Sequence, residues 1–370
     1  MTDLVVAGAG MAGLVAAAEA RRLGARPAVW EKGDRLGGSM ALSTGMIWRY
    51  RTFEDFRAQC PRGDPALQRL VFEHLDEDLD WLESLGAAVA ARDTGNPRTV
   101  GRRFEPPGLV AALGAAAGSV ELGRPARELP PVPLVLACGG FAANRALVGR
   151  HITREADSLL LRASPWSTGD GLALGRRAGA QFSAGLDEFY GRAMPAPPAR
   201  IGESDFVELA QVYARHATVR NARGEGYVAR TWSEIDVVQW MARQPGARAW
   251  FTVSERALAE RVRERTVAEV IEAGREAGMS VRSGSDGVTV EVVAGITTTL
   301  GGIAIDDHAR VAPGVFAAGA DAGGISTGGY SSGLAGALVL GRIAARSAVA
   351  AAGRGERPRT ERAEALQEGS

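Results

Sequence analysis

The chain has 370 residues, 46% hydrophobic and 23% charged, so it is long and apolar enough to bury a sizeable core, which argues against global disorder. Its 43 basic and 43 acidic side chains cancel to a formal net charge of zero, which argues against a nucleic-acid or anionic-membrane partner held by a global field. Two cysteines and four histidines without zinc-ligand spacing indicate no disulfide framework and no metal site. No signal-peptide pattern precedes the first apolar segment, and we expect a cytoplasmic protein.

The N-terminal segment DLVVAGAGMAGLVAAAEARRLGARPAVWEKGDRLGGS predicts a strand, a glycine turn, a helix and a second strand. Apolar residues 4–7 form the first strand, residues 12–23 are helix-forming with one apolar side, and residues 28–30 form the second strand. This order of elements is the beginning of a parallel α/β unit.

Three glycines in the first turn have the spacing G-x-G-x-x-G, at Gly8, Gly10 and Gly13. Gly8 permits the tight turn, Gly10 lets the backbone approach a pyrophosphate, and Gly13 lets helix and strand pack closely. Glu31 follows the second strand about twenty residues later, where a carboxylate accepts hydrogen bonds from an adenosine ribose. The pattern therefore predicts a dinucleotide whose phosphates lie at the helix N-terminus.

A second loop of small residues follows that carboxylate, in EKGDRLGGSMALSTGMIW. It contains Gly37, Gly38, Ser39, Ser43 and Gly45. A nicotinamide dinucleotide does not need this loop, whereas the diphosphate and ribityl chain of a flavin dinucleotide continue past the first turn. The loop favours FAD over NAD.

Four later segments carry a family resemblance: GDPALQRLVFEHLDEDLDWLESLGA, PLVLACGGFAANRAL, SPWSTGDGLALGRRAGA, and FAAGADAGG with GGYSSGLAGALVLGRIA. They are similar to a helix ending in W-L-x-x-L-G, a strand before G-G-F-x-x-N, a T-G-D-G helix start and a closing segment. With the N-terminal motif they resemble the flavoprotein family of fumarate reductase and succinate dehydrogenase, which includes ketosteroid and tricarballylate dehydrogenases. The resemblance covers most of the chain.

The resemblance implies an α/β fold: a Rossmann-like FAD-binding domain with a parallel sheet and an inserted, smaller α+β cap. We expect residues 1–184 and 281–352 to form the FAD-binding domain, residues 185–280 the cap, and residues 353–370 a flexible tail. Within the cap, the charged segment 253–279 predicts one amphipathic helix.

The resemblance also implies the cofactor site. No histidine lies in the early glycine-serine loop, where succinate dehydrogenases attach flavin, so we expect non-covalent FAD. The family's A-A-G-E/D motif reads A-A-G-A-D here, so either the loop shifts by one residue or the hydrogen bond from Asp321 is absent. The expected cofactor-binding residues are Gly8, Gly10, Met11, Ala12, Gly13, Glu31, Lys32, Gly37, Gly38, Ser39, Ser43, Thr44, Gly45, Ala137, Gly139, Gly140, Thr168, Asp170, Gly319, Ala320, Asp321, Tyr330, Ser332, Gly333 and Leu334.

Three departures from the family argue against fumarate reduction. Thr297 and Thr298 stand where fumarate reductases carry histidines, and Tyr330 replaces a substrate-binding arginine. Arg230 stands at the usual glutamate position of the cap, and Glu234 falls near the position of the arginine that acts as proton donor. These residues resemble the ketosteroid and tricarballylate dehydrogenases more closely.

The expected catalytic residues are Tyr330, Thr298, Arg230 and Glu234. Tyr330 would polarise a substrate carbonyl or, alternatively, pack on the flavin edge. Thr298 would donate to a substrate oxygen or be a simple turn residue. Arg230 and Glu234 would pair four residues apart on a helix, in the site or on the surface. Tyr190 and Arg192 are further candidates.

The sequence predicts an FAD-dependent oxidoreductase that transfers hydride between flavin N5 and a CH–CH or C=C bond next to a carbonyl or carboxylate. One alternative is an oxidase of C–N or C–O bonds, and another is a catalytically degenerate FAD-binding subunit. We expect a small-molecule substrate, no membrane partner and an electron partner that the sequence does not name. Five tryptophans would suit an apolar or aromatic substrate, although core packing explains them equally well: Trp48, Trp166, Trp232, Trp240 and Trp250.

Overall fold

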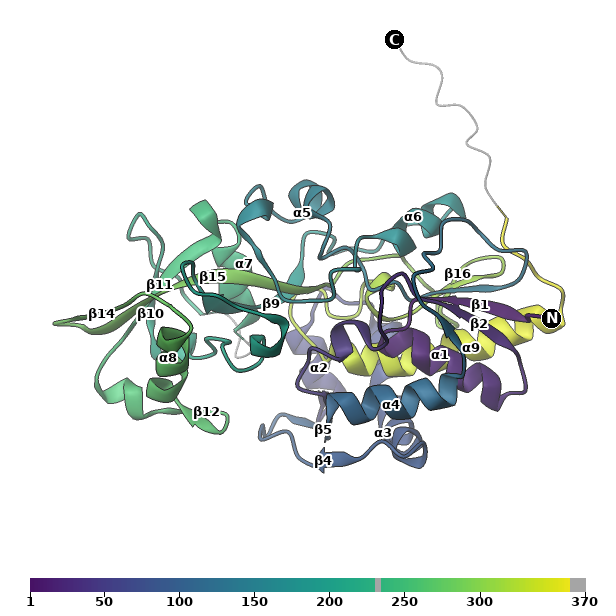
Figure 1. Ribbon diagram of the computed structural model, residues 1–370, viewed down its shortest axis with the longest axis horizontal. Coiled ribbons are helices and arrows are strands. Elements are labelled where there is room, and N and C mark those ends of the chain that lie inside the picture. Colours follow the sequence, from purple (N-terminus) through teal and green to yellow (C-terminus); the bar gives the residue numbers. More distant parts are fainter. Residues whose placement is uncertain (230–233, 360–370) are drawn as a thin grey trace, which may run out of the picture.

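The computed structural model describes residues 1–229 and 234–359. Figure 1 shows an elongated molecule with the N-terminal sheet and its helices at one end and a second sheet at the other. We call the part that carries the second sheet, residues 189–299, the outer lobe. The long strand β15 connects the two ends, so it brings outer-lobe residues to the edge of the N-terminal part.

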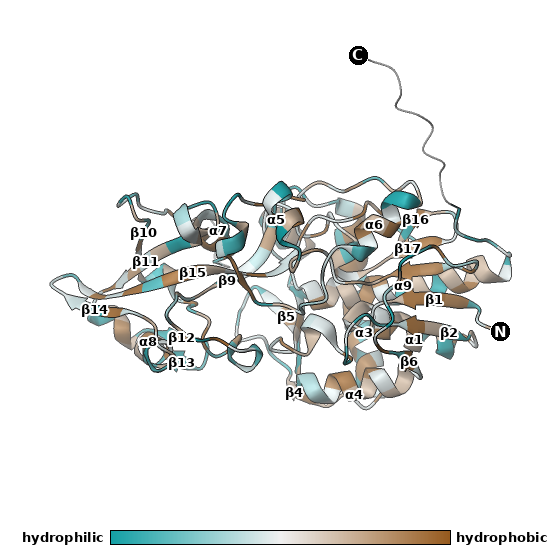
Figure 2. Ribbon diagram, turned by 45° about the horizontal axis from the view of Figure 1, so that its top comes forward, coloured by the Kyte–Doolittle hydropathy of each residue, from teal (hydrophilic) through white to brown (hydrophobic). Residues whose placement is uncertain are grey.

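The first sheet has six strands in the order β16-β17-β7-β1-β2-β6. All neighbours are parallel except β16 and β17, which confirms the expected parallel α/β sheet. Its central strands are fully buried, and Figure 2 shows β1 and β17 in the colours of hydrophobic residues. The strands are β1 (Leu4–Ala7), β2 (Pro27–Trp30), β6 (Val120–Glu121), β7 (Leu134–Leu136), β16 (Arg310–Ala312) and β17 (Val315–Ala317).

Helices α1 (Met11–Arg22) and α9 (Gly333–Gly353) pack against each other, α1 also contacts α4 (Pro106–Ala117), and α9 contacts α3 (Pro65–Ser84). Within the described residues, α9 is the one helix long and apolar enough to cross a membrane, and 67% of its apolar window is buried inside the protein. The remaining α-helices of this part are α2 (Phe53–Gln59), α5 (Arg145–His151) and α6 (Asp170–Arg177).

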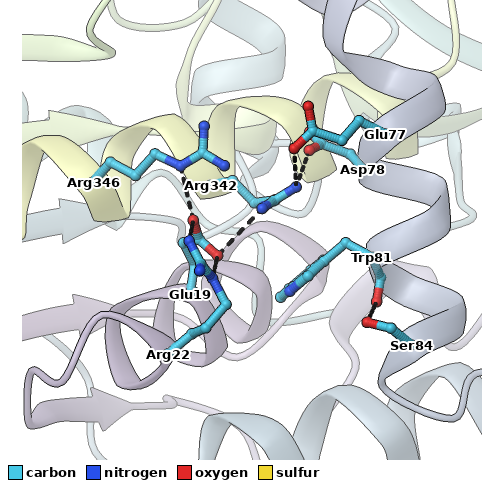
Figure 3. A network of polar contacts seen from close by, with 8 residues as sticks. All are labelled: Glu19, Arg22, Glu77, Asp78, Trp81, Ser84, Arg342 and Arg346. Atoms are coloured by element: carbon cyan, nitrogen blue, oxygen red, sulfur yellow. Dashed lines mark hydrogen bonds and ion pairs between the residues drawn. The ribbon is translucent and has the colours of Figure 1, made fainter.

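Charged side chains are buried where α1, α3 and α9 meet, as Figure 3 shows. Arg342 on α9 contacts Asp78 on α3, and its Nε lies 3.4 Å from Glu19 on α1. Glu19 also accepts hydrogen bonds from Arg22 and Arg346, both at 2.8 Å. These contacts connect three helices that the apolar core already holds together.

The outer lobe is built on a sheet in the order β10-β11-β15-β14. Strand β9, and strand β8 from before the lobe, pair with the C-terminal half of β15. The expected domain boundary at residue 280 falls inside this sheet, because β14 and β15 follow it. The strands are β8 (Leu160–Leu161), β9 (Phe189–Pro195), β10 (Thr218–Arg220), β11 (Arg248–Val253), β14 (Val281–Gly284) and β15 (Gly287–Thr299).

The single helix expected over residues 253–279 is wrong. The chain there finishes β11, makes a short hairpin of β12 (Arg261–Val262) and β13 (Arg265–Thr266), and forms α8 only over Val267–Glu276. Thr266 starts α8 through a capping box with Glu269, since each side chain accepts from the other's backbone N–H. The other described α-helix of the lobe is α7 (Ile235–Met241).

The remaining elements are short. A small antiparallel sheet that the sequence did not predict has the order β3-β5-β4 and packs beside α9 and α3. Its strands are β3 (Met46–Tyr50), β4 (Val89–Ala91) and β5 (Thr99–Phe104). The 3₁₀ helices are Gly38–Met40, Ala156–Ser158, Glu203–Asp205, Ala214–His216, Pro245–Ala247, Arg256–Ala259 and Gly319–Asp321.

The described start of the expected tail is held by polar contacts. Glu356 forms an ion pair with Arg310 and accepts a hydrogen bond from the N–H of Gly314 at 2.7 Å. Residues 360–370, the rest of the segment expected to be flexible, lie outside the described residues.

Candidate active site

An elongated cavity runs from the turn after β1 to the end of β15, with a volume of about 1810 Å³ including solvent at its mouth. Most of the residues expected to bind the cofactor line it, although they come from both ends of the sequence. These are Gly8, Gly10, Met11, Ala12, Glu31, Lys32, Gly38, Ser39, Ser43, Thr44, Ala137, Gly139, Asp170, Gly319, Ala320, Tyr330, Ser332, Gly333 and Leu334.

The first turn is crowded on the protein side and open on the cavity side. A Cβ on Gly8, whose φ is +107°, would lie 2.1 Å from the carbonyl oxygen of Ala137. A Cβ on Gly13 would lie 1.9 Å from the carbonyl oxygen of Gly8, whereas the nearest atom to one on Gly10 is 4.0 Å away. Helix α1 begins at Met11 with its N-terminus at this opening. The turn therefore fits a pyrophosphate that approaches the backbone at Gly10.

Polar groups beyond the turn fit the adenosine end of a dinucleotide. Glu31 accepts hydrogen bonds from the N–H groups of Ala9 at 2.7 Å and Gly33 at 2.6 Å, which fixes its carboxylate at the cavity wall. The indole N–H of Trp30 is buried at this wall without a hydrogen-bond partner. An orphaned donor in a cavity is satisfied by a ligand acceptor.

Lys32 connects two segments at the same end. Its Nζ lies 2.5 Å from the carboxylate of Asp170 at the start of α6 and also contacts Thr168. Thr168 does not itself line the cavity, and Trp166 lies at the rim with 40% of its surface exposed. The expected T-G-D-G helix start is therefore part of the cavity's edge.

Six of the expected cofactor-binding residues do not line the cavity. They are Gly13, Gly37, Gly45, Gly140, Thr168 and Asp321. Several of these support the lining from behind; a Cβ on Gly45, for example, would lie 1.9 Å from the carbonyl oxygen of Phe104. Backbone packing therefore requires glycine at position 45.

Asp321 lies behind the cavity wall. It is fully buried and accepts hydrogen bonds from the N–H groups of Cys138 and Gly140, while Ala320 takes the position facing the cavity. Burial raises the pKa of Asp321 to about 6, against the effect of those two hydrogen bonds. The carboxylate of Asp321 thus holds the G-G-F turn in place from behind the cavity wall.

Two tyrosines lie at the opposite end of the cavity. Tyr330, in the loop before α9, stacks on Tyr190 from β9 with ring centroids 4.0 Å apart and planes at 11°. Trp48 contacts Tyr330 edge-on at 5.9 Å, and the hydroxyl of Tyr50 donates to the carbonyl oxygen of Tyr330 at 2.6 Å. Elements from the N-terminal part and the outer lobe thus meet at this pair.

Three arginines lie close to the tyrosine pair. The Nε of Arg192 donates to the hydroxyl of Tyr190 at 3.0 Å, and its guanidinium lies 5.1 Å from that ring. Arg162, which follows β8, and Arg263, between β12 and β13, line the cavity. Their charges are near enough to shift the proton affinity of Tyr190.

The two phenols differ in proton affinity for that reason. Burial would raise the pKa of Tyr190, but the charges of Arg192, Arg162 and Arg263 outweigh burial and lower it to about 8. Burial raises the pKa of Tyr330 far above its usual range, and the nearby Tyr190 adds to this. Tyr330 therefore remains a neutral donor, while Tyr190 can release its proton near neutral pH.

Threonines at the end of β15 form the wall beside the tyrosines. The pairing of β15 with β9 shifts between Ile296 and Thr298, and Thr297, Thr298 and Thr299 all line the cavity. The hydroxyl of Thr297 accepts from Arg162 at 2.8 Å, and Thr298 donates to the carbonyl oxygen of Thr299 at 3.3 Å. Among the described residues, the buried hydroxyl of Thr299 has no hydrogen-bond partner.

Of the other two expected catalytic residues, the structure describes only Glu234, which is not on the cavity wall. Arg230 lies outside the described residues, so its pairing with Glu234 stays a prediction. Glu234 precedes α7 with φ +58° and accepts from the N–H of Arg215 at 3.3 Å. Burial raises the pKa of Glu234, partly offset by the charge of Arg192. The charge of Glu234 influences the nearby arginines electrostatically, but Glu234 does not line the cavity.

Sequence reasoning missed Arg162 and Arg263 and gave little weight to Tyr190 and Arg192. The chain has 43 lysines and arginines, and nothing in the pattern around residues 162 and 263 separates them from surface arginines. The pairing of β8 and β9 with β15 brings Arg162 and Arg192 together, and the β12–β13 hairpin adds Arg263. No cluster of three or more potential metal ligands occurs in the part of the chain that the structure describes.

Comparison with known proteins identifies one family and several solved structures with a similar fold. Residues 3–108 and 131–336 match a family described as FAD binding domain. None of the curated proteins matches the chain. Among solved structures, a flavocytochrome c3 fumarate reductase in an open conformation is 21% identical, with 95% of this chain and 78% of that chain covered and a TM-score of 0.71.

Two ketosteroid dehydrogenases are similar to a comparable degree. The 3-ketosteroid-Δ4-(5α)-dehydrogenase of Rhodococcus jostii RHA1 is 19% identical, with 94% of this chain and 96% of that chain covered and a TM-score of 0.66. The 3-ketosteroid Δ1-dehydrogenase of Sterolibacterium denitrificans is 15% identical, with 94% and 99% covered and a TM-score of 0.72. At these identities the similarity establishes a common fold.

Proposed function

Because the chain belongs to the FAD binding domain family, we propose that it is an FAD-dependent oxidoreductase acting on a CH–CH or C=C bond next to a carbonyl or carboxylate of a small molecule. FAD, held without a covalent bond, supplies the hydride acceptor or donor at flavin N5 when it is bound. The observation that carries the proposal is the stacked pair of phenols, in which the pKa of Tyr190 is lowered and the pKa of Tyr330 is raised.

Removing two hydrogens from a CH–CH bond requires that one leave as a hydride and the other as a proton. Neutral Tyr330 donates a hydrogen bond to the substrate carbonyl, which acidifies the adjacent C–H. Tyr190 accepts that proton when it is ionised, and Arg192 stabilises the phenolate from 3.0 Å away. In the opposite direction Tyr190 would return the proton to carbon, and reduced FAD, when bound, would supply the hydride.

The outer lobe serves this reaction as an inserted cap. It contributes Tyr190 and Arg192 from β9, Arg263 from the β12–β13 hairpin and Thr298 from β15, whereas Tyr330 belongs to the N-terminal part. Closing such a lobe over a substrate excludes water from the reacting carbon.

The tyrosine pair favours the type of chemistry that the two ketosteroid dehydrogenases are named for over fumarate reduction. One of those structures contains 4-androstene-3,17-dione and the other 1,4-androstadiene-3,17-dione. Both of these ligands carry a carbonyl group. Tyr330 is a neutral hydrogen-bond donor that a carbonyl oxygen could accept from. We therefore infer only that the substrate of this protein also carries a carbonyl group.

An anaerobic screen tests the proposal. Purified FAD-loaded protein is mixed with saturated ketones and carboxylates, and in parallel with amines and alcohols, and the loss of the oxidised flavin absorption band is followed. We expect bleaching, and a product that is two hydrogens lighter with a new C=C bond. An imine, or a carbonyl formed from an alcohol, would contradict the proposal in favour of C–N or C–O oxidation. A flavin that dithionite reduces but no organic donor or acceptor affects would indicate a degenerate subunit.

A further inference from the structure

A hydrogen bond from the side chain of Glu188 joins the two segments that carry the stacked phenols. Glu188 immediately precedes β9, two residues before Tyr190, and Gly328 lies in the loop before α9, two residues before Tyr330. The N–H of Gly328 donates to Oε2 of Glu188 at 2.7 Å. We propose that Glu188 is a positioning residue that sets the distance between Tyr190 and Tyr330. This inference rests on the proposed function, because it concerns the two groups to which that function assigns the substrate and the proton.

Glu188 stands where the chain enters the outer lobe, beside the point where the chain leaves it. Its carbonyl oxygen accepts from the N–H of Leu300 at 3.0 Å, and the next residue, Phe189, pairs with Thr299 at the end of β15. The carboxylate is buried and reaches from this crossing to the loop before α9. A contact made here therefore acts on how the outer lobe is placed against the N-terminal part.

The loop before α9 is fixed on its other side by the N-terminal part. The N–H of Arg62 donates to the carbonyl oxygen of Thr327 at 3.1 Å, and the side chain of Arg62 forms an ion pair with Glu188. A Cβ on Gly329 would lie 1.8 Å from the carbonyl oxygen of Gln59, so the loop backbone packs directly on this segment. Because one side of the loop is fixed, the carboxylate of Glu188 determines where β9 lies relative to it.

The acceptor oxygen of Glu188 contributes more to this placement than its ion pair does. The side chain of Arg62 is 63% exposed, and an ion pair with an exposed partner is weak. The hydrogen bond from Gly328 ends on a carboxylate that is only 4% exposed, where a directional bond to a charged acceptor is strong. A cleft of about 1040 Å³, including solvent, lies beside both contacts. Water reaches this side of the junction, and the hydrogen bond fixes it there.

The distance between the phenols matters because their proton affinities depend on close contacts. Burial would raise the pKa of Tyr190, but the charges of Arg192, Arg162 and Arg263 lower it to about 8. A looser junction admits water, which solvates the phenol and screens the arginines. The net shift then shrinks, and the pKa of Tyr190 returns toward its ordinary value of 10.0. Tyr330 also moves from its place, and a misplacement of about 1 Å can slow a reaction about 10²-fold.

Three substitutions of Glu188 separate its acceptor oxygen from its charge. Glu188→Leu removes both, and Glu188→Asp keeps the charge but withdraws the oxygen by one methylene group. Glu188→Gln loses the charge but keeps an oxygen that can accept from Gly328. Asp187→Leu is the matched control, because Asp187 is the neighbouring acid and its side chain is 58% exposed. We expect Glu188→Leu and Glu188→Asp to be impaired, and Glu188→Gln and Asp187→Leu to resemble the wild type.

NMR of FAD-loaded protein with isotope-labelled tyrosine rings measures the ionisation of Tyr190 without turnover. The chain has five tyrosines, and Tyr190→Phe identifies the signal of Tyr190. We expect its midpoint at a pH of about 8 in the wild type, and at least about one pH unit higher in Glu188→Leu and Glu188→Asp. An unchanged midpoint in Glu188→Leu would overturn the proposal. A shift in Glu188→Gln with none in Glu188→Asp would also overturn it, and this pair decides the question if Glu188→Leu does not fold.

The rate of flavin reduction by the best compound of the screen gives a second readout. We expect it to fall about 10- to 10²-fold in Glu188→Leu at normal FAD content, with a pH dependence that moves together with the NMR midpoint. The titration fails separately from the proposed function. Flavin reduction with an unchanged midpoint in Glu188→Leu would leave the function standing and remove the role of Glu188. A shifted midpoint in a protein whose flavin no carbonyl compound reduces would do the reverse.

Discussion

Two groups of three arginines lie in this molecule, and they differ in what surrounds them. Arg22, Arg342 and Arg346 gather around Glu19 and Asp78 between α1, α3 and α9, as Figure 3 shows. The second group lines or borders the cavity beside the tyrosine pair: Arg162, Arg192 and Arg263. The same residue type therefore holds buried carboxylates in one place and lowers the pKa of a buried phenol in the other.

The pKa values of the acids in the first group show how it is balanced. Burial would raise the pKa of Glu19, but hydrogen bonds from Arg22 and Arg346 and the charge of Arg342 lower it to about 2. Burial raises the pKa of Asp78 to about 6, although Arg342 opposes this. Glu19 is thus fully compensated by its arginines, whereas Asp78 is compensated only in part.

Removing the central arginine of the first group should have the largest effect on stability. Arg342 is 4% exposed and packs 4.8 Å from the ring of Trp81. Arg342→Met keeps most of the volume but leaves Asp78 and Glu19 without their shared cation. We expect a loss of about 3–5 kcal/mol in the free energy of unfolding, measured by urea denaturation. Arg346→Gln, whose side chain is 42% exposed, is the control and should cost far less.

Removing the neutral phenol should have the largest effect on catalysis. Tyr330→Phe keeps the stack on Tyr190 but loses the hydrogen bond to the substrate carbonyl. We expect flavin reduction by the best compound of the screen to slow by about 10²–10³-fold, measured by stopped-flow under anaerobic conditions. Normal FAD content is the control. A rate within twofold of the wild type would assign Tyr330 to packing on the flavin edge.

The second phenol should determine the pH dependence. Tyr190 has a pKa of about 8 and acts as a base when ionised, so the rate of substrate oxidation should rise as pH increases through about 8. In Tyr190→Phe this rise should disappear, with a loss of about 10²–10⁴-fold. Arg192→Gln removes the cation that stabilises the phenolate, so the rise should move to higher pH. The same rise in Tyr190→Phe would exclude Tyr190 as the base.

The smallest expected effect is on the pH dependence of stability, and it comes from Asp78, whose charge is compensated only in part. Its folded pKa, about 6, exceeds the ordinary value of 3.8, so between these values the folded state holds a proton that the unfolded state lacks. The contribution of Asp78 to stability therefore falls as pH rises from about 4 to about 6, by about 3 kcal/mol at most. Asp78→Asn should lack this slope in urea midpoints. An identical slope in both proteins would contradict the assignment to Asp78.

The two regions also differ in how well the sequence predicted them. Gly8, Gly10 and Glu31 lie within one strand-turn-helix-strand unit, so their spacing alone predicts a phosphate turn. The tyrosine end of the cavity contains residues from β9, β15 and the loop before α9, and no local sequence pattern predicts that they lie close together. Asp321 illustrates the limit, because a shift of one residue turned an expected ligand into a buried support.

The capping box at Thr266 teaches a similar lesson. The charged segment before it has helical periodicity, yet the side chain of Thr266 starts a new helix and leaves the preceding residues to form a hairpin. That hairpin carries Arg263 to the cavity. A site residue was therefore hidden inside what the sequence predicted as one surface helix.

FAD binding in the cavity is tested most directly by an absorption spectrum of the purified protein before and after acid precipitation, with the released flavin identified by mass. We expect a yellow protein that contains one FAD per chain and releases it completely into the supernatant. A colourless protein that added FAD does not reconstitute would contradict the assigned cavity. Colour that remains in the pellet would contradict non-covalent binding.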